Sequence, residues 1–438
     1  MFFDRPQLGS NALVVHTAFG VEPASNPLEF RELVRAAGLA ASVEAQVRRP
    51  MPSSKFLIGP GKVEALAQCV ATEQIDVALF DCALSGAQER NLEHSLGCRV
   101  LDRTGLILVI FALRARSHEG KLQVELAQLE HMSTRLVRGW SHLDRQKGGI
   151  GLRGAGEKQL ELDQRMLRAR MRSIRSRLDQ VRKQRAQGRR SRARAELPTL
   201  SLVGYTNSGK STLFNRLTQA GVYAADQLFA TLDSTLRRVE WPELGPAVLA
   251  DTVGFIRDLP HQLVDAFHAT LEETQAADLL LQVVDASDPD HDTHHLEVEA
   301  VLAEIGACDR PRLWVYNKID ALSDSRPRID RDAAGTAVRV WISAREGCGI
   351  DLLQQAITER LVPDLIDTRL SISPAHGRLR ARLYDSGAVV EEDTDAAGQF
   401  VLHLRGSGHD LARLFRSEGL ELDRLNGRSD VGQPRPGH

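Results

Sequence analysis

Cysteine is scarce in this chain of 438 residues, and its five cysteines are widely separated. They form no Cys-x-x-Cys pair and are odd in number, which argues against zinc fingers and extracellular disulfides. No window approaches the ~18 consecutive apolar residues of a membrane span. The first residues, Met-Phe-Phe-Asp-Arg-Pro-Gln, lack the pattern of a signal peptide. We therefore expect a cytoplasmic protein with no stable membrane insertion, and leave open a peripherally membrane-associated fraction.

Net charge is small but unevenly distributed. The chain carries −2 overall, whereas the window 164–195 holds twelve arginines and Lys183 against the single acid Asp179. This window has a charge of +12, so the rest of the chain carries −14. Such asymmetry indicates a polyanionic partner. The window contains no Phe, Tyr or Trp, which favours phosphate and shape contacts to folded RNA over base stacking.

Apolar patterning divides the chain into four parts and predicts an α/β protein. Residues 1–115 alternate short apolar strands with helices, which predicts a mostly parallel sheet. Residues 116–197 predict two amphipathic helices that fold back as an antiparallel hairpin, with a glycine-rich tip at 148–156 and a basic second helix. Residues 198–363 alternate strand and helix over the length of one nucleotide-binding domain. Residues 364–438 predict a small C-terminal domain with a disordered tail.

A phosphate-binding loop begins the third part. Gly204-Tyr-Thr-Asn-Ser-Gly209-Lys210-Ser211 follows a buried strand and precedes a helix, as the motif G-x-x-x-x-G-K-S/T requires. In this motif the backbone N–H groups surround the phosphates at a helix N-terminus. Lys210 is expected to reach the β- and γ-phosphate oxygens, and the Ser211 hydroxyl to ligate Mg²⁺.

Three further motifs, each at the end of an apolar run, predict guanine specificity. Asp251-Thr-Val-Gly254 is D-x-x-G, whose carboxylate holds Mg²⁺ through water and whose glycine N–H meets the γ-phosphate. Asn317-Lys-Ile-Asp320 is N-K-x-D; the Asp320 carboxylate accepts hydrogen bonds from guanine N1 and N2, donors that adenine lacks. Ser343-Ala-Arg345 supplies the turn that supports the base. The four motifs in this order predict a GTP-hydrolysing domain.

A switch threonine and a missing glutamine complete the prediction. Thr231 lies between the phosphate loop and D-x-x-G and is expected to ligate Mg²⁺ when the γ-phosphate is present. Phe255 follows Gly254, where many GTPases have a glutamine that orients water, so hydrolysis is expected to be slow without an activator. Asn207 occupies the position of an asparagine that helps to hold K⁺ in potassium-dependent GTPases, so we expect K⁺ as an additional cofactor.

Lys210, Thr231 and Gly254 are the expected catalytic residues, and Ser211 and Thr231 the metal ligands. The complete expected nucleotide-binding set is Gly204, Tyr205, Thr206, Asn207, Ser208, Gly209, Lys210, Ser211, Thr212, Phe229, Ala230, Thr231, Leu232, Asp233, Asp251, Thr252, Val253, Gly254, Asn317, Lys318, Asp320, Ser343, Ala344 and Arg345.

The motif strings resemble the HflX family of GTPases over most of the chain. The resemblance rests on the phosphate loop, Phe229-Ala-Thr-Leu-Asp233, the string from Asp251 to His261, Phe56-Leu-Ile-Gly-Pro-Gly-Lys, Leu101-Asp-Arg-Thr-Gly-Leu-Ile-Leu and Gly148-Gly-Ile-Gly-Leu-Arg-Gly. It implies a monomeric, Mg²⁺-dependent GTPase that binds the large ribosomal subunit and ribosomal proteins, does not bind DNA, and splits stalled or idle ribosomes after stress such as heat. It also implies that the hairpin tip approaches the rRNA of the peptidyl-transferase region. The tip departs from the family pattern R-G-P-G-E-S/T at Ala155 and Lys158, and Ser234 stands where the family has proline.

Several alternatives remain open. The chain could be a GTP-regulated rRNA-binding factor in large-subunit maturation without splitting activity. A helicase-like nucleotidase would need a second nucleotide site in the N-terminal part, where no second phosphate-loop motif occurs. Gly149-Ile-Gly-Leu-Arg-Gly154 matches G-x-G-x-x-G but follows an amphipathic helix rather than a strand, which argues against a dinucleotide site. The acidic and histidine residues of 288–295 have metal-ligand chemistry, but acidic residues are also expected where a helix begins.

Overall fold

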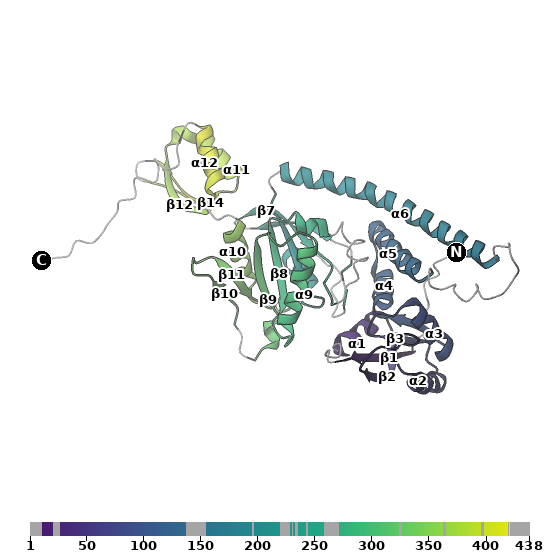
Figure 1. Ribbon diagram of the computed structural model, residues 1–438. Coiled ribbons are helices and arrows are strands. Elements are labelled where there is room, and N and C mark those ends of the chain that lie inside the picture. Colours follow the sequence, from purple (N-terminus) through teal and green to yellow (C-terminus); the bar gives the residue numbers. More distant parts are fainter. Residues whose placement is uncertain are drawn as a thin grey trace.

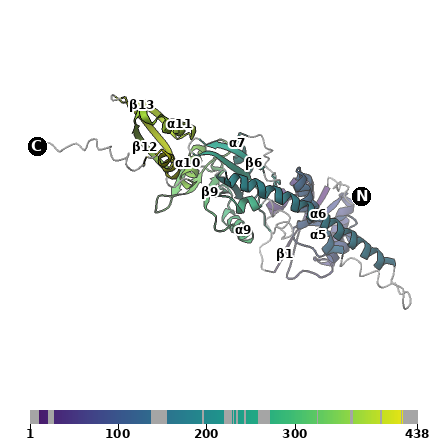
Figure 2. The same cartoon turned by 90° about the horizontal axis from the view of Figure 1, so that it is seen from above.

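The computed structural model describes residues 11–20, 27–136, 155–194, 197–219, 228–229, 231–232, 235–241, 244–257, 271–323, 326–361, 365–395, 398–418 and 420. It confirms the α/β fold class, with an N-terminal parallel sheet, a helical hairpin, a central sheet and a small C-terminal sheet (Figure 1). The N-terminal and C-terminal parts lie at opposite ends of the molecule in both views (Figures 1 and 2). Most of the expected hairpin tip, 148–154, and the tail 426–438 lie outside the described residues. No helix within the described ranges is both long and apolar enough to cross a membrane.

The N-terminal part is a four-stranded parallel sheet in the order β2-β1-β3-β4. Its elements are β1 (Asn11–Phe19), α1 (Pro27–Ala36), β2 (Ala40–Arg49), α2 (Pro60–Thr72), β3 (Val77–Phe80), α3 (Gly86–Leu96), β4 (Arg99–Asp102) and α4 (Arg103–Arg114).

Alternating side chains of β1 divide this part into two cores, because successive residues of a strand point to opposite faces of the sheet. Leu13 and Val15 face the core formed with α2 and α3, whereas Ala12 and Val14 face the core formed with α1 and α4. The Asp102 carboxylate begins α4 by accepting the Gly105 N–H at 2.8 Å, as an N-cap residue does. The second core continues into the central domain.

The hairpin consists of α5 (His118–Leu136) and α6 (Ala155–Arg194), which lie alongside each other (Figure 2). Their apolar stripes meet as expected, with Leu122, Leu126 and Leu129 of α5 packed on Ile174 and Leu178 of α6. Beyond the start of α5, α6 continues toward the central domain (Figure 1).

Some arginines of α6 are used within the hairpin, which the sequence analysis did not foresee. Acidic residues of α5 pair with Arg170, Arg175 and Arg185, through Glu125 at 2.6 Å, Glu130 at 2.8 Å and Glu119 at 2.7 Å respectively. By contrast, Arg165, Arg168 and Arg172 are exposed and have no ion-pair partner among the described residues. The arginines of α6 thus form a paired set and an unpaired set.

The central domain has seven strands in the order β10-β11-β9-β8-β5-β7-β6; the pairs β6–β7 and β10–β11 are antiparallel and the others parallel. Its strands are β5 (Thr199–Gly204), β6 (Thr235–Trp241), β7 (Gly245–Asp251), β8 (Leu279–Asp285), β9 (Arg312–Asn317), β10 (Arg328–Arg331) and β11 (Ala337–Trp341). Its helices within the described residues are α7 (Lys210–Thr218), α9 (His291–Glu304) and α10 (Ile350–Leu361), with a 3₁₀ turn η2 (Ile319–Ala321). The carboxyl ends of β5, β7, β8 and β9 meet at one edge, where parallel sheets bind ligands.

The C-terminal part is a three-stranded antiparallel sheet in the order β12-β14-β13. It contains β12 (Leu365–Ile372), the 3₁₀ turn η3 (Pro374–His376), α11 (Gly377–Asp385), β13 (Val389–Thr394), β14 (Phe400–Ser407) and α12 (Gly408–Ser417). Leu402, Leu404 and Phe415 lie in its small core.

The hairpin core generates a stability prediction. Ile174 is fully buried between α5 and α6, so Ile174→Ala should destabilise the hairpin by about 2–5 kcal/mol through lost burial and a residual cavity. Ser173→Ala, at the exposed neighbouring position, is the control. Hydrogen exchange of the α5 and α6 amides measures the difference. Equal protection in the two variants would contradict the packing described.

Candidate nucleotide site

The loop between β5 and α7 requires glycine at two positions. Gly204 has φ 148°, and a Cβ there would lie 2.2 Å from the Val283 carbonyl oxygen. Gly209 has φ 94°, and a Cβ there would lie 2.1 Å from the Asn317 Nδ2. Any side chain at either position would force the loop open, because L residues avoid this φ region and real Cβ atoms do not approach other atoms so closely.

Lys210 is buried inside this loop. Its Nζ donates to the carbonyl oxygens of Gly204 at 3.0 Å and Tyr205 at 2.6 Å. Burial lowers the pKa of Lys210 to about 8, an effect that the nearby Asp251 carboxylate opposes. The hydroxyls of Thr206 and Ser208 are also buried and have no hydrogen-bond partner in the described part of the chain. Buried donors without partners are costly, and phosphate oxygens would satisfy them.

Three oxygen-bearing side chains converge beside Lys210. The Ser211 and Thr231 hydroxyl oxygens lie 2.5 Å apart, and each hydroxyl donates to Asp251 Oδ2 at 2.9 Å. Burial raises the pKa of Asp251, and its Oδ1 has no hydrogen-bond partner among the described residues. Two hydroxyls and a carboxylate with an unsatisfied oxygen are the ligand types that Mg²⁺ prefers. Thr212 follows in the first turn of α7.

The D-x-x-G segment lies close over the phosphate-binding loop. Thr252 is fixed by its hydroxyl, which donates to the Leu202 carbonyl oxygen at 2.6 Å, and Val253 is buried. A Cβ at Gly254 would lie 2.9 Å from Thr206 Cα and 3.0 Å from Lys210 Nζ. Glycine therefore allows the backbone of this segment to approach the position expected for the γ-phosphate.

Asn317 joins the phosphate-binding loop to the guanine side of the site. Its Nδ2 donates to the Ser208 carbonyl oxygen, and its Oδ1 accepts the Ala344 N–H, both at 2.9 Å. Ser343 holds the nearby Asp320, since its hydroxyl donates to Asp320 Oδ1 at 2.7 Å. The Asp320 carboxylate is thus oriented by a hydrogen bond within the protein.

Two further residues, which the sequence analysis missed, hold this side of the site. Asp285, at the end of β8, pairs with Lys318 Nζ at 2.7 Å. Arg216 of α7 donates from Nε to the Ala344 carbonyl oxygen at 3.2 Å and from its terminal nitrogen to the Arg345 carbonyl oxygen. Both contacts join segments far apart in sequence, and no local spacing signals them.

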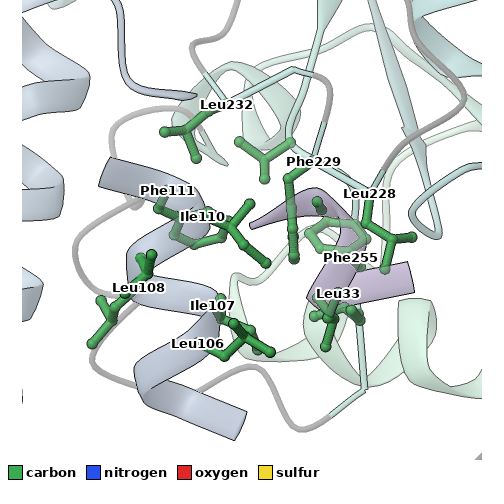
Figure 3. Packing of buried hydrophobic residues seen from close by; sticks show 14 of the residues in the cluster. Leu33, Leu106, Ile107, Leu108, Ile110, Phe111, Leu228, Phe229, Leu232 and Phe255 are labelled. Carbon is green, nitrogen blue, oxygen red and sulfur yellow. The ribbon is translucent and has the colours of Figure 1, made fainter. Parts of the chain in front are cut away.

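Not every expected residue faces the loop interior. Phe229 and Leu232 are buried against helix α4 (Figure 3). The side chain of Tyr205 points to the N-terminal part, where its hydroxyl donates to Glu29 Oε1 at 3.0 Å. Ala230 and Asp233 lie outside the described residues.

The histidine-rich segment 288–295 borders this site. His294 Nδ1 lies 2.7 Å from Asp288 Oδ2, and the His294 ring stacks on Tyr205 with centroids 3.9 Å apart. Within the described ranges, no group of three or more His, Cys, Asp or Glu residues is arranged to hold a metal ion. The segment lies around the start of α9 and packs on the loop.

Family models match three consecutive regions of the chain. Residues 25–112 match the N-terminal region of GTP-binding GTPases, residues 114–192 the middle region, and residues 199–318 the 50S ribosome-binding GTPase domain. Among solved structures, that of SsGBP in complex with GDP is 25% identical, has a TM-score of 0.47, and covers 80% of this chain and 98% of its own.

Two curated relatives extend along most of the chain. The GTPase HflX of Magnetococcus marinus is 46% identical over 366 residues, 83% of this chain and 84% of the relative. The GTPase HflX of Escherichia coli (strain K12) is 54% identical over 424 residues, 97% of this chain and 100% of the relative. With the phosphate loop and guanine-side residues assembled at one sheet edge, the chain belongs to the HflX family of P-loop GTPases and has a GTPase domain of the 50S ribosome-binding class.

Proposed function

We propose that the residues at the carboxyl edge of the central sheet act together in GTP hydrolysis. The Lys210 ammonium group stabilises the negative charge of the β- and γ-phosphate oxygens, and the Gly254 N–H donates a hydrogen bond to the γ-phosphate. Ser211 and Thr231 would hold Mg²⁺ through their hydroxyls and Asp251 would hold it through water, a role that the unsatisfied Asp251 Oδ1 supports. Bound Mg²⁺ supplies charge that stabilises the transferring phosphoryl group.

Hydrolysis is slow when the chain is alone. The Phe255 side chain is 2% exposed and packs in the core shared with the N-terminal part, and a phenyl ring can neither donate nor accept the proton of a water molecule. An external partner therefore accelerates the reaction.

That partner is the large ribosomal subunit. The observation that carries this proposal is the unpaired row Arg165, Arg168 and Arg172 on the exposed face of α6. Arginines that have no acidic partner among the described residues, on a helix that lacks aromatic residues, suit the phosphates of folded RNA. The hairpin approaches rRNA near the peptidyl-transferase region and ribosomal proteins, and the monomeric GTP-bound protein splits stalled or idle ribosomes under stress.

Sedimentation of intact ribosomes with the protein and a non-hydrolysable GTP analogue tests this function. Conversion of intact ribosomes to free subunits is the expected result. Co-migration with large-subunit precursors, without loss of intact ribosomes, would instead assign a role in subunit maturation.

Base recognition gives one prediction. Asp320→Asn should weaken GTP binding by about 100-fold, because two hydrogen bonds to a charged acceptor are lost. It should also improve binding of xanthosine triphosphate, whose C2 oxygen can accept from the new amide. Equilibrium binding of both nucleotides measures the change. Unchanged GTP affinity would show that Asp320 does not read the base.

The two arginine sets of α6 give a second prediction, with a matched control. Replacing Arg165, Arg168 and Arg172 by Gln should weaken binding to the large subunit. It should also make the plot of log affinity against log salt concentration less steep by about 2–3, because each lost phosphate contact removes ~0.7–0.9 from this slope. Replacing the paired set Arg170, Arg175 and Arg185 by Gln removes the same charge and should change the slope less.

Affinity for the isolated large subunit at several KCl concentrations measures both slopes, and GTP binding without ribosomes should remain unchanged in both variants. Equal losses in the two variants would mean that net charge alone, and not the exposed row, attracts the subunit.

The monovalent cation gives a third prediction. Asn207 has φ 60° in the phosphate-binding loop, and we propose that its side-chain oxygen helps to hold K⁺ beside the phosphates. Hydrolysis should then be faster in KCl than in NaCl of equal ionic strength. Asn207→Ala should remove the difference. Equal wild-type rates in the two salts would rule out the cation site.

A further inference from the structure

The middle of helix α4 is buried on all sides, which is unusual for a helix that covers one face of a four-stranded sheet. Its residues Leu106 to Phe111 are all 6% exposed or less. One side packs on the N-terminal sheet, and the other packs against Leu228, Phe229, Leu232 and Phe255 of the central domain (Figure 3). The segment around Thr231 therefore has its apolar side chains in a core that another domain supplies.

The central contact of this core is an aromatic pair. The rings of Phe111 and Phe229 are edge-to-face, with centroids 4.6 Å apart and an interplanar angle of 86°. This is the geometry that aromatic rings favour. Both side chains are 2% exposed or less.

The backbone at Phe229 is strained. Its φ is 55°, in the left-handed region that bulky residues rarely adopt. Such conformations persist where surrounding contacts fix them, and they concentrate at functional sites. The ring of Phe111 contacts the ring of Phe229 from outside its own domain.

Thr231 lies two residues beyond Phe229, and its hydroxyl reaches Ser211 and Asp251 at 2.5 and 2.9 Å. The neighbouring Leu228 and Leu232 are also buried in the shared core. Buried apolar residues therefore lie on both sides of Thr231 in the sequence, while its hydroxyl points to the oxygens of Ser211 and Asp251.

In addition to the shared apolar core, a polar network joins the N-terminal part to the central domain. Arg103 at the start of α4 pairs with Glu29 of α1 at 2.6 Å and donates to the Arg257 carbonyl oxygen at 3.2 Å. Tyr205 donates to the same Glu29 and accepts the Arg257 N–H, both at 3.0 Å. These contacts fix α1 and the start of α4 against the phosphate-binding loop, and so fix where Phe111 lies.

We propose that Phe111 is a positioning residue for GTP hydrolysis that the N-terminal domain supplies to the switch segment. It holds Phe229 in the left-handed conformation and thereby sets Thr231 at the Ser211–Asp251 pair. A switch threonine is needed only when the γ-phosphate is present. The contact between Phe111 and Phe229 therefore raises the affinity of the site for GTP relative to GDP. The inference rests on the proposed role of Thr231 in binding GTP.

The test is a double-mutant cycle in the full chain, with Phe111→Leu, Phe229→Leu and both together. The measured quantity is the affinity for a fluorescent non-hydrolysable GTP analogue relative to GDP, with Mg²⁺ and without ribosomes. Each single variant should lower this ratio about tenfold with little change in GDP affinity, and the double variant should lower it no further. The hydrolysis rate at saturating GTP should fall as well.

Phe80→Leu is the matched control. Phe80 is fully buried in the same N-terminal sheet but faces the other core, which contains no central-domain residue that the structure describes. Phe80→Leu should leave the affinity for the GTP analogue relative to GDP unchanged. Phe229 belongs to the central domain and contacts the N-terminal part only through the shared core, so Phe229→Leu keeps the test decisive even if Phe111→Leu unfolds the N-terminal part.

A ratio that stays constant, or rises, in both single variants overturns the positioning role of Phe111. Additive losses in the double variant would show that the two rings act independently, which also overturns it. Absence of Mg²⁺-dependent binding of the analogue to the wild-type chain would instead overturn the proposed nucleotide site.

Discussion

The segment around Thr231 buries its apolar side chains against another domain. Thr231 can meet Ser211 and Asp251 only while its loop stays ordered, and fixing a loop residue costs about 1–2 kcal/mol of conformational entropy. Fully burying a Leu or Phe side chain stabilises by about 1.5–3 kcal/mol. The burial of three such side chains, Leu228, Phe229 and Leu232, is therefore comparable in size with the cost of ordering the residues around Thr231.

The local geometry around the motifs could be predicted from the sequence, because each motif follows a strand of the central sheet that fixes its direction. Gly204 and Gly209 have the positive φ that the loop needs, and Ser343 reaches Asp320. The contacts that cross the chain could not be read. Tyr205 and Glu29 are 176 residues apart, and Arg216 and Ala344 are 128 residues apart. The sequence around a tyrosine in a phosphate-binding loop, or around an arginine on a helix, contains no pattern that predicts which distant residue it will contact.

Helix α4 and the arginines of α6 show two other limits of sequence reasoning. The uninterrupted apolar run Leu106 to Phe111 has no amphipathic period, because both sides of α4 are buried, and so it did not indicate a helix between two domains. Charge counting likewise treats all arginines of α6 alike. Arg170 and Arg175 have partners 45 residues away on α5, and only the folded hairpin separates them from the unpaired row.

The hairpin and the nucleotide site are joined directly along the chain. Helix α6 is 40 residues long, which corresponds to about 60 Å at ~1.5 Å per residue, and β5 begins only five residues after it ends. Strand β5 in turn ends at Gly204, the first residue of the phosphate-binding loop. Helix α5, packed on α6, follows α4 after a short connection. A partner that shifts the hairpin therefore acts on both sides of Thr231, on the loop through β5 and on the switch segment through α4.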